Sequence, residues 1–528
     1  MRSGVFWKGA AQLTAQISGT VTTLILARLL SPSDFGLAGL VLIFTVLFQL
    51  FADIGFTASL VQFEHLSERD RSTAFWTGLA VAVACFGVAV LISPYVADFY
   101  HQPRVRWMFV VIASGVVLGA LSNTQAALLT RKMDFRRVET RGMAASIASA
   151  VVGITAALMH AGAWSLIGAA IAGTVVSTIT IWIVSPWKPH LVYSLHSLRR
   201  MASFSTGMLV SRFSSYLDRN TDNLLVGKFL GTASLGIYAI GYSVITLPFE
   251  RIVSPVSSVI TPAFAALQDD DEGARALWLR AERLIAAVVF PAMVGVIVVA
   301  SDFVPVVLGS QWTQAVRIIQ ILAWVAIVQA LTYPNGGLYL SRYRMGTFVR
   351  ISLLTLVLDI LAFAVGLHWG VNGVASAYAI TNTFVIVPAG LLIACRILAI
   401  SPLRLAAAVR GVVEATLVMA AVVLGLRRIL ELEGVGAPLR LIILVVSGAA
   451  VYLLMCWWRD RQLLAELQGF TGRRLPRPRW PQWLRTAGVR RGTDADPVGD
   501  SLRETDSVAA SNRRQPSRIS GVGTETDF

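Results

Sequence analysis

Long apolar segments separated by short polar turns follow one another along the chain as far as Trp458. Each has about 20 residues or more, the length that an α-helix needs to cross the apolar core of a bilayer. Breaks at Gly, Pro and charged residues divide them into about fourteen predicted spans, at residues 7–30, 36–61, 73–97, 104–130, 139–159, 162–184, 203–229, 233–264, 276–300, 313–339, 346–367, 371–397, 404–428 and 438–458. The pattern therefore predicts an all-α integral membrane protein.

A sequence repeat relates the two halves of this helical region. Residues 26–37 and residues 226–237 each place a cation near the end of an apolar helix, then a short turn, then a Gly that opens the next helix. Residues 159–166 and residues 367–374 form a second matching pair, each at the turn between the fifth and sixth helices of its half. Because both repeats begin on the same side of the membrane, we expect parallel repeats related by an axis along the membrane normal.

The repeat predicts how the chain is organised. We expect an N-lobe at residues 1–200 with helices 1–6 and a C-lobe at residues 201–400 with helices 7–12. Two extra helices follow at residues 401–460. Residues 461–528 have too little apolar surface to fold, so we expect a disordered basic cytoplasmic tail there.

Charge orients the predicted helices. The chain carries a net charge of +15, but its cations gather in alternate loops and in the tail. They follow the fourth, sixth, tenth and twelfth predicted spans, as Arg131, Lys132, Arg136, Arg137, Arg141, Lys188, Arg199, Arg200, Arg342, Arg344, Arg350, Arg396, Arg404 and Arg410. Since cytoplasmic loops concentrate Lys and Arg, we place both termini in the cytoplasm and expect no nucleic-acid binding.

The seventh predicted helix carries the most unusual polar residues for a membrane span. Arg212, Ser215, Arg219 and Asp222 recur at helical spacing, so one face of this helix can line an aqueous cavity at membrane depth. The same residues also permit a purely structural network, in which Arg219 pairs with Asp222 or with Asp218. Pairing and cavity lining can coexist.

The first predicted helix holds the equivalent place in the other repeat and carries a matching polar stripe that includes Gln12 and Gln16. We therefore expect these two helices to face each other across a central cavity between the lobes. Other polar residues at membrane depth are candidates either for this cavity or for structural hydrogen bonds: Gln49, Asp53, Glu250, Arg251, Arg317, Gln320, Ser352, Thr355 and Asp359.

Several motifs of enzymes and ATP-driven pumps are absent from the sequence. It contains no GxxxxGK[ST] phosphate-binding loop and no HExxH motif, and its three cysteines are widely spaced. We therefore expect a transporter, not an enzyme, with no metal, no cofactor and an energy source outside the chain.

The motifs together resemble the polysaccharide flippases of the MOP superfamily, the Wzx or colanic acid exporter type. The likeness rests on the residues 27–36 (ARLLSPSDFG), 127–136 (ALLTRKMDFR), 222–231 (DNLLVGKFLG) with 235–238 (LGIY), and 309–312 (GSQW). It covers about residues 5–400, and the two extra helices match the fourteen-span form of the family.

The resemblance implies a function in exopolysaccharide or lipopolysaccharide assembly. Its substrate would be a polyprenyl-diphosphate-linked oligosaccharide, carried across the bacterial cytoplasmic (inner) membrane by alternating access, with a polysaccharide polymerase or assembly protein as a partner. Arginine binds diphosphate in a bidentate manner, which makes the cations partners for the lipid-linked substrate: Arg28, Arg212, Arg219, Lys228, Arg251 and Arg317.

Relatives often exchange substrate for a proton or a sodium ion, so membrane carboxylates are candidates for ion coupling. These are Asp53, Glu250, Asp222 and Asp359. Two other functions remain open on the sequence, namely a cation-coupled drug or metabolite antiporter of the same fold and a membrane glycan polymerase. A cavity dominated by carboxylates would favour the antiporter, whereas one dominated by arginines favours an anionic substrate.

Overall fold

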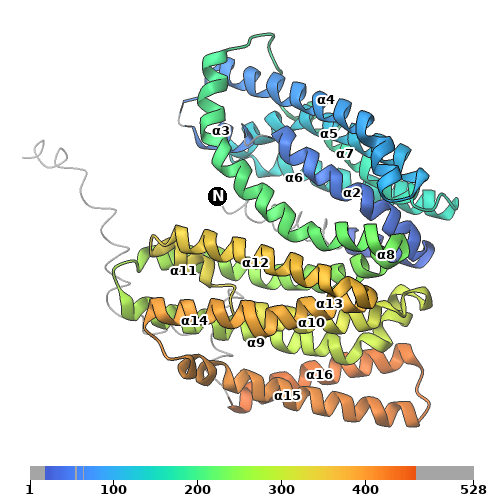
Figure 1. The fold of residues 1–528 in the computed structure, drawn as a ribbon, viewed down its shortest axis with the longest axis vertical. Helices are drawn as coiled ribbons and strands as arrows, with labels where there is room; N and C mark the ends of the chain where they lie inside the picture. Colours follow the sequence, from blue (N-terminus) through green and yellow to red (C-terminus); the bar gives the residue numbers. More distant parts are fainter. Residues whose placement is uncertain (1–17, 54–55, 64, 460–528) are drawn as a thin grey trace, which may run out of the picture. The chain divides into compact units, whose positions relative to one another are not determined.

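The structure is a computed structural model that describes residues 18–53, 56–63 and 65–459. Every regular element in this part of the chain is a helix (Figure 1). Eleven helical segments in it are long and apolar enough to cross a membrane. The all-α membrane fold is thereby confirmed. The count of about fourteen spans stays a prediction, because residues 345–398 form one continuous apolar segment and residues 1–17 lie outside the description.

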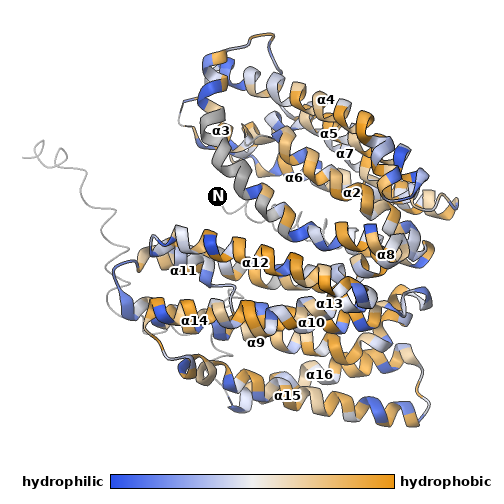
Figure 2. Cartoon of the chain, viewed as in Figure 1, coloured by the Kyte–Doolittle hydropathy of each residue, from blue (hydrophilic) through white to orange (hydrophobic). Residues whose placement is uncertain are grey.

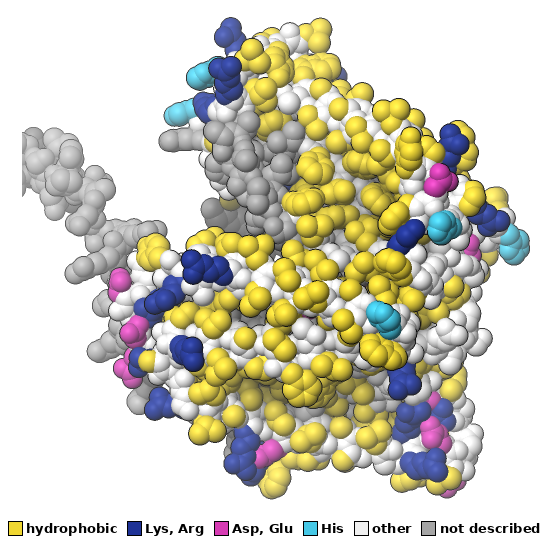
Figure 3. Space-filling model, in the orientation of Figure 1, with side chains coloured by type: hydrophobic (Ala, Val, Ile, Leu, Met, Phe, Trp, Pro, Cys, Tyr) yellow, Lys and Arg dark blue, Asp and Glu magenta, His cyan; other side chains and the backbone are white. Residues whose placement is uncertain are grey.

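Polar residues gather near the ends of the helices and hydrophobic residues run along them (Figure 2). The space-filling view shows the same division on the visible surface, where hydrophobic side chains cover the middle of the helices and charged side chains lie near their ends (Figure 3). This is the distribution that lipid around the helices and water at their ends require.

The first half of the chain forms α2 to α7, after a helical stretch at residues 18–29. The bounds are Pro32–Asp53 (α2), Phe56–Gln62 (α3), Glu68–Phe99 (α4), Pro103–Arg131 (α5), Phe135–Leu158 (α6) and Trp164–Val184 (α7). Local signals set several starts. Ser67 and Asp70 form a capping box at α4, Pro103 occupies the first turn of α5, and Asp134 caps α6.

The second half forms α8 to α16, with short 3-10 and π-helical turns between some of them. The bounds are Leu195–Ala266 (α8), Asp271–Phe303 (α9), Val304–Leu308 (η1), Ser310–Trp312 (η2), Ala315–Ala330 (α10), Asn335–Ser341 (α11), Met345–Gly366 (α12), Leu367–Trp369 (η3), Gly370–Thr381 (α13), Asn382–Ile386 (η4), Val387–Leu398 (α14), Pro402–Leu432 (α15) and Ala437–Arg459 (α16). The predicted spans 203–229 and 233–264 both belong to α8, which kinks at Gly231. The φ of 82° at Gly231 is one that glycine adopts without steric cost.

Glycines of the two sequence repeats bring α2 and the second half of α8 into backbone contact. A Cβ atom on Gly36 would lie 1.7 Å from the carbonyl oxygen of Thr232, and one on Gly236 would lie 1.8 Å from that of Pro32. The contacts are reciprocal, because Gly36 and Gly236, like Pro32 and Thr232, occupy matching positions of the repeat. We call this contact the glycine crossing, and it leaves no room for a side chain.

Residues 309–312 fasten the second half of the chain to the helical stretch before α2. The indole Nε1 of Trp312 donates to the carbonyl oxygen of Ala27 at 2.7 Å, and Nε2 of Gln311 donates to the same oxygen at 2.9 Å. Trp312 is fully buried and packs edge to face against Phe35, with ring centroids 5.3 Å apart. We call this end of the helices, which holds the glycine crossing and residues 309–312, the turn end.

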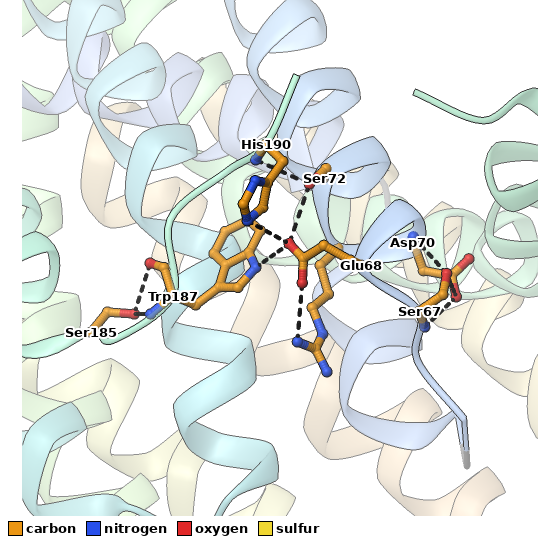
Figure 4. Close-up of polar contacts among 8 residues, drawn as sticks. Ser67, Glu68, Asp70, Ser72, Ser185, Trp187 and His190 are labelled. Atoms are coloured by element: carbon orange, nitrogen blue, oxygen red, sulfur yellow. Dashed lines mark hydrogen bonds and ion pairs between the residues drawn. The ribbon is translucent and has the colours of Figure 1, made fainter. Parts of the chain in front are cut away.

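The connection between α7 and α8 is held against the start of α4 (Figure 4). The indole of Trp187 donates to Glu68 at 2.6 Å, and the backbone N–H of His190 donates to the hydroxyl of Ser72 at 3.2 Å. The His190 Nε2 also lies 3.9 Å from a Glu68 oxygen. These bonds fix the segment that links the two repeats onto the first of them.

The two extra helices, α15 and α16, are tied to α9. The hydroxyl of Tyr452 on α16 donates to the carbonyl of Ala287 at 2.6 Å. Asp302 is only 1% exposed, accepts from Nε of Arg440 at 2.8 Å and lies 3.1 Å from Nε of Arg427. One buried carboxylate therefore binds a cation from each extra helix. The predicted tail at residues 461–528 lies outside the described residues.

Candidate functional site

A cavity of about 1050 Å³ lies between the helical stretch before α2, α2, α3, α5, α6, α7 and the first half of α8. We call it the first cavity. Its described polar lining consists of hydroxyls, amides and four charged groups: Thr22, Thr23, Gln49, Asp53, Thr57, Ser122, Asn123, Arg141, Ser146, Ser149, Thr174, Ser177, Arg212, Tyr216, Arg219 and Asn220. Three arginines against one aspartate suit an anionic, hydroxyl-rich molecule.

Arg212, predicted to bind substrate, lines this cavity and is paired. Its Nη1 lies 2.7 Å from an oxygen of Asp53, a predicted ion-coupling residue on α2. Asp53 also accepts a hydrogen bond from the hydroxyl of Thr57. The arginine is 44% exposed and the aspartate 18% exposed, so the pair lies at the cavity surface, where a solute can reach it. The structure thus brings a proposed substrate residue and a proposed coupling residue into one ion pair.

Arg219, further along α8, also forms an ion pair with a carboxylate. Its Nη1 lies 2.9 Å from an oxygen of Glu250, another predicted coupling residue. Both side chains are widely exposed, at 67% and 49%. Arg219 lines the first cavity and also a second one of about 520 Å³, and Glu250 lines the second. Arg219 is therefore shared between the two cavities.

The second cavity is enclosed by α8 and α10 to α14 and has an aromatic and amide lining. The polar members of its described lining, besides Arg219 and Glu250, are Tyr242, Thr246, Gln329, Thr332, Tyr333, Asn335, Tyr339, Thr355, Tyr378 and Asn382. Nε2 of Gln329 donates to the hydroxyl of Tyr378 at 2.8 Å and to Oδ1 of Asn382 at 2.9 Å. This network joins side chains to one another, whereas the hydroxyls of Ser146, Ser149 and Thr174 in the first cavity donate to backbone carbonyls.

The two remaining predicted carboxylates are buried. Asp359 on α12 is 6% exposed and accepts from Nδ2 of Asn382 at 3.3 Å, which places it directly behind the second cavity. Asp222 on α8 is 4% exposed and accepts from the backbone N–H of Asn223 at 2.7 Å. Neither belongs to the described lining of a cavity.

The two cations of the repeat motif lie at the turn end and bind backbone carbonyls. Arg28 donates to Val307 at 2.9 Å and also to Val306. Lys228 donates to the carbonyl of Phe99, and its Nζ lies 4.1 Å from the centroid of the Phe99 ring. Neither is among the described lining residues of the two cavities, so their part in substrate binding stays a prediction.

Arg317 lies exposed on α10, outside the described lining of both cavities. Four predicted positions fall outside what the structure describes. Gln12 and Gln16 belong to residues 1–17, and the side chains of Ser215 and Arg251 on α8 are not among the described ones.

One wall of the first cavity comes from α6 and α7, which the sequence patterns did not single out. Arg141, Ala145 and Ser149 follow one another at intervals of four residues along one face of α6, and Thr174 and Ser177 line it from α7. A helical projection of residues 139–159 contains this polar stripe. The pattern of loop cations groups Arg141 with the cytoplasmic cluster that follows the fourth predicted span, so it does not indicate this stripe.

Metal chemistry has no candidate in the described part of the chain, where no group of three or more His, Cys, Asp or Glu residues is arranged to hold an ion. Buried Cys395 and Cys456 and half-buried Cys85 are free thiols.

Comparison with known proteins agrees with this architecture. Residues 25–317, more than half of the chain, match a family model described as polysaccharide biosynthesis protein. The teichuronic acid biosynthesis protein TuaB of Bacillus subtilis (strain 168) is 27% identical over 464 residues, which is 86% of this chain and 94% of that protein. The lipopolysaccharide biosynthesis protein WzxC of Escherichia coli (strain K12) is 25% identical over 391 residues, or 73% of this chain and 78% of that protein.

Among solved structures, the lipid II flippase MurJ in an inward closed conformation matches with a TM-score of 0.68 at 15% identity. The match covers 87% of this chain and 99% of MurJ, so the two proteins share a fold. The resemblance predicted from the repeat motifs is confirmed, and with its family model matched over more than half its length, the chain belongs to the polysaccharide biosynthesis protein family.

Proposed function

We propose that the protein is a flippase, which moves a polyprenyl-diphosphate-linked oligosaccharide across the cytoplasmic membrane by alternating access. The observation that carries this proposal is the first cavity, in which three arginines and a wall of hydroxyl and amide groups line a space of about 1050 Å³ within apolar helices. The names of similar proteins support it, since TuaB and WzxC are named for polysaccharide biosynthesis and MurJ for lipid flipping.

Each part of the substrate meets a suitable environment in this proposal. Sugar hydroxyls exchange water for the Ser, Thr, Asn and Gln groups of the wall, while the diphosphate binds arginine through charge-assisted hydrogen bonds. The polyprenyl tail stays in the bilayer, which avoids the cost of transferring it to water. The protein acts by binding and movement, with no covalent chemistry.

We propose that the two ion pairs of the cavities provide ion coupling. Asp53 and Glu250 each hold an arginine that the substrate anion needs. An anion that takes over Arg212 or Arg219 leaves a carboxylate free to bind a proton or a sodium ion. Asp359 behind the second cavity is a further candidate for binding the cation that is exchanged for the substrate.

The orientation that we propose has both termini in the cytoplasm and the turn end at the periplasmic side of a bacterial inner membrane. The glycan would then be released where a polymerase or assembly protein can extend it. The N-lobe at residues 1–200, the C-lobe at residues 201–400 and the two extra helices at residues 401–460 remain part of the proposal, with membrane lipids around them.

The second functional hypothesis is a cation-coupled drug or metabolite antiporter of the same fold. It calls for a carboxylate-dominated site for organic cations, whereas Asp53 is the single carboxylate in the described lining of the first cavity and is already paired with Arg212. The charge of the lining therefore favours the flippase.

Deletion of the gene tests the function. We expect loss of surface polysaccharide and accumulation of the prenyl-diphosphate-linked oligosaccharide in the inner leaflet, measured by lipid extraction and by accessibility to an externally added glycosidase. Plasmid-borne wild type should restore export, and Arg212→Gln should restore it poorly at equal membrane abundance. Normal export in the deletion strain would refute the proposal.

A further inference from the structure

Arg141 differs from the other arginines of the first cavity in having no counter-ion. Arg212 and Arg219 each lie within 3 Å of a carboxylate oxygen, at 2.7 Å and 2.9 Å. For Arg141, no hydrogen bond or ion pair joins it to any described residue, and its Nε is buried without a partner. Glu139, two residues earlier, acts on it electrostatically without forming an ion pair.

A half-buried guanidinium without a protein partner is costly, because buried polar groups normally find partners in protein or water. Arg141 lines the cavity, and no carboxylate among the described residues forms an ion pair with it. An incoming anion therefore meets no internal competitor at this position, whereas at Arg212 it must displace Asp53.

The hydroxyl groups around Arg141 are oriented by the backbone. Ser146 donates to Gly142 at 3.0 Å, Ser149 donates to Ala169 at 2.7 Å, and Thr174 donates to Ala170 at 2.9 Å. Since each hydroxyl proton is used within the helices, the oxygen lone pairs are what remain for a ligand.

The two threonines that line the cavity from the helical stretch before α2 also donate to backbone carbonyls. Thr22 donates to the carbonyl of Ser18 at 2.7 Å, and Thr23 to that of Gly19 at 2.9 Å. Five hydroxyls of the cavity thus act as acceptors toward a ligand, and Arg141 acts as a donor among them. The complementary ligand offers many hydroxyl donors and one anionic acceptor.

We propose that Arg141 is the specificity-determining residue of the first cavity: its guanidinium binds one acidic oxygen group of a sugar-containing ligand while the surrounding hydroxyls accept from the sugar. The acidic group is either the diphosphate or the carboxylate of an acidic sugar, which share this chemistry. The inference rests on the proposed function and deepens it.

Binding to the purified full-length protein in lipid nanodiscs tests the assignment. The probes are farnesyl diphosphate, a glucuronate-containing tetrasaccharide, and the neutral tetrasaccharide of N-acetylglucosamine. We expect Arg141→Gln to weaken binding of one anionic probe by about tenfold or more, as for loss of a charge-assisted hydrogen bond, and to leave the neutral probe unchanged. Loss for farnesyl diphosphate identifies the diphosphate as the anion, and loss for the acidic tetrasaccharide identifies the sugar carboxylate.

Arg141→Lys should retain part of the affinity because it keeps the charge and loses the bidentate geometry. Arg428→Gln is the matched control, since Arg428 is an exposed cation on α15 outside the described cavity lining, and it should bind all probes as the wild type does. Equal weakening of all three probes by Arg141→Gln, or weakening of none, would overturn the proposal. So would a wild type that binds neither anionic probe more tightly than the neutral one.

Failure of this inference is distinguishable from failure of the proposed function. If wild type restores polysaccharide export in the deletion strain and Arg141→Gln restores it equally well, Arg141 is not the anion site and the flippase function stands. If deletion of the gene leaves export normal, the flippase function itself fails.

Discussion

A charged side chain within a membrane protein needs a partner. In the first cavity two arginines pair with a carboxylate, and the third has no such partner among the described residues. Arg212 and Arg219 hold carboxylates 159 and 31 residues away in the sequence. Arg141 faces a wall of hydroxyl oxygens instead. An anion entering the cavity therefore displaces an internal group at two positions and meets open donors at the third. This difference decides which substitution raises affinity for an anion and which lowers it.

Replacing Asp53 by Asn should strengthen anion binding. The change removes the charge that occupies Arg212, and an exposed pair of this kind is worth little, so we expect about two- to fivefold tighter binding of farnesyl diphosphate. Export should fall nevertheless if Asp53 carries the coupling ion. Titration in nanodiscs measures the affinity, with Glu414→Gln, which breaks an ion pair with Arg410 on α15 away from both cavities, as the control. Weaker binding by Asp53→Asn would contradict the competition between the carboxylate and the substrate.

Sequence patterns located individual polar residues better than their partners. The stripe of α8 was predicted to face a cavity, and Arg212 and Arg219 do line one. That Arg212 pairs with Asp53 was not predictable, because helical spacing describes one helix and says nothing about which residue of another helix lies opposite. Arg141 was missed for a different reason, since a basic cluster at a helix end is typical of cytoplasmic loops.

Two helices can approach each other most closely where a glycine leaves no side chain between them. At the glycine crossing, α2 and the second half of α8 meet through Gly36 and Gly236, each against a carbonyl oxygen of the other helix. One turn further along α2, Gly39 has ordinary clearance, with the nearest atom of Leu235 at 3.7 Å from a Cβ built there. Two glycines of one helix thus face different amounts of space.

Gly36→Ala should therefore be far more harmful than Gly39→Ala. The first places a methyl group where the carbonyl oxygen of Thr232 lies and forces the helices apart. Overpacking of this kind lowers the free energy of unfolding by about 1–3 kcal/mol. The second adds a helix-favouring residue where there is room, worth within about 1 kcal/mol of neutral. Thermal unfolding of the purified variants and surface polysaccharide measure the effects. Equal thermal stability and equal surface polysaccharide in the two variants would show that the glycine crossing can widen at no cost in free energy.

The helices themselves were largely predictable, because apolar length and Gly, Pro and charge breaks reveal membrane spans. The turn expected at Gly231 is confirmed, because the backbone of this residue is non-helical, with φ 82° and ψ 177°, and divides α8 into two helices. Hydropathy does not report the angle between two helices.

The orientation of the whole molecule has its own test. In a chain without Cys85, Cys395 and Cys456, Met159→Cys and Leu191→Cys place exposed thiols at opposite ends of the helices, since the native side chains are 81% and 90% exposed. We expect a membrane-impermeant maleimide to label Met159→Cys in intact spheroplasts and Leu191→Cys only after permeabilisation, because the loop cations predict a cytoplasmic position for residues 185–194. The reverse labelling would invert the proposed topology.

The family and the membrane architecture were visible in the sequence because the repeat motifs carry turns and helix ends, which are local features. The division of the polar residues between two cavities was not, since it depends on how the helices pack. The two cavities have dissimilar linings, one with three arginines and hydroxyls that donate to the backbone, the other with tyrosines and amides that bond one another.

The reciprocal form of the glycine crossing bears on how such a chain can arise. A patch that meets its own counterpart is an isologous contact, the kind that holds a homodimer together about a two-fold axis. Two separate copies of a six-helix unit bearing one such glycine would make both contacts without being covalently joined. Once the copies are fused, the glycine crossing itself requires only the two glycines and the carbonyl oxygens that face them. The rest of each copy is then free to diverge, so one small symmetric contact is compatible with two unlike binding chambers in the same molecule.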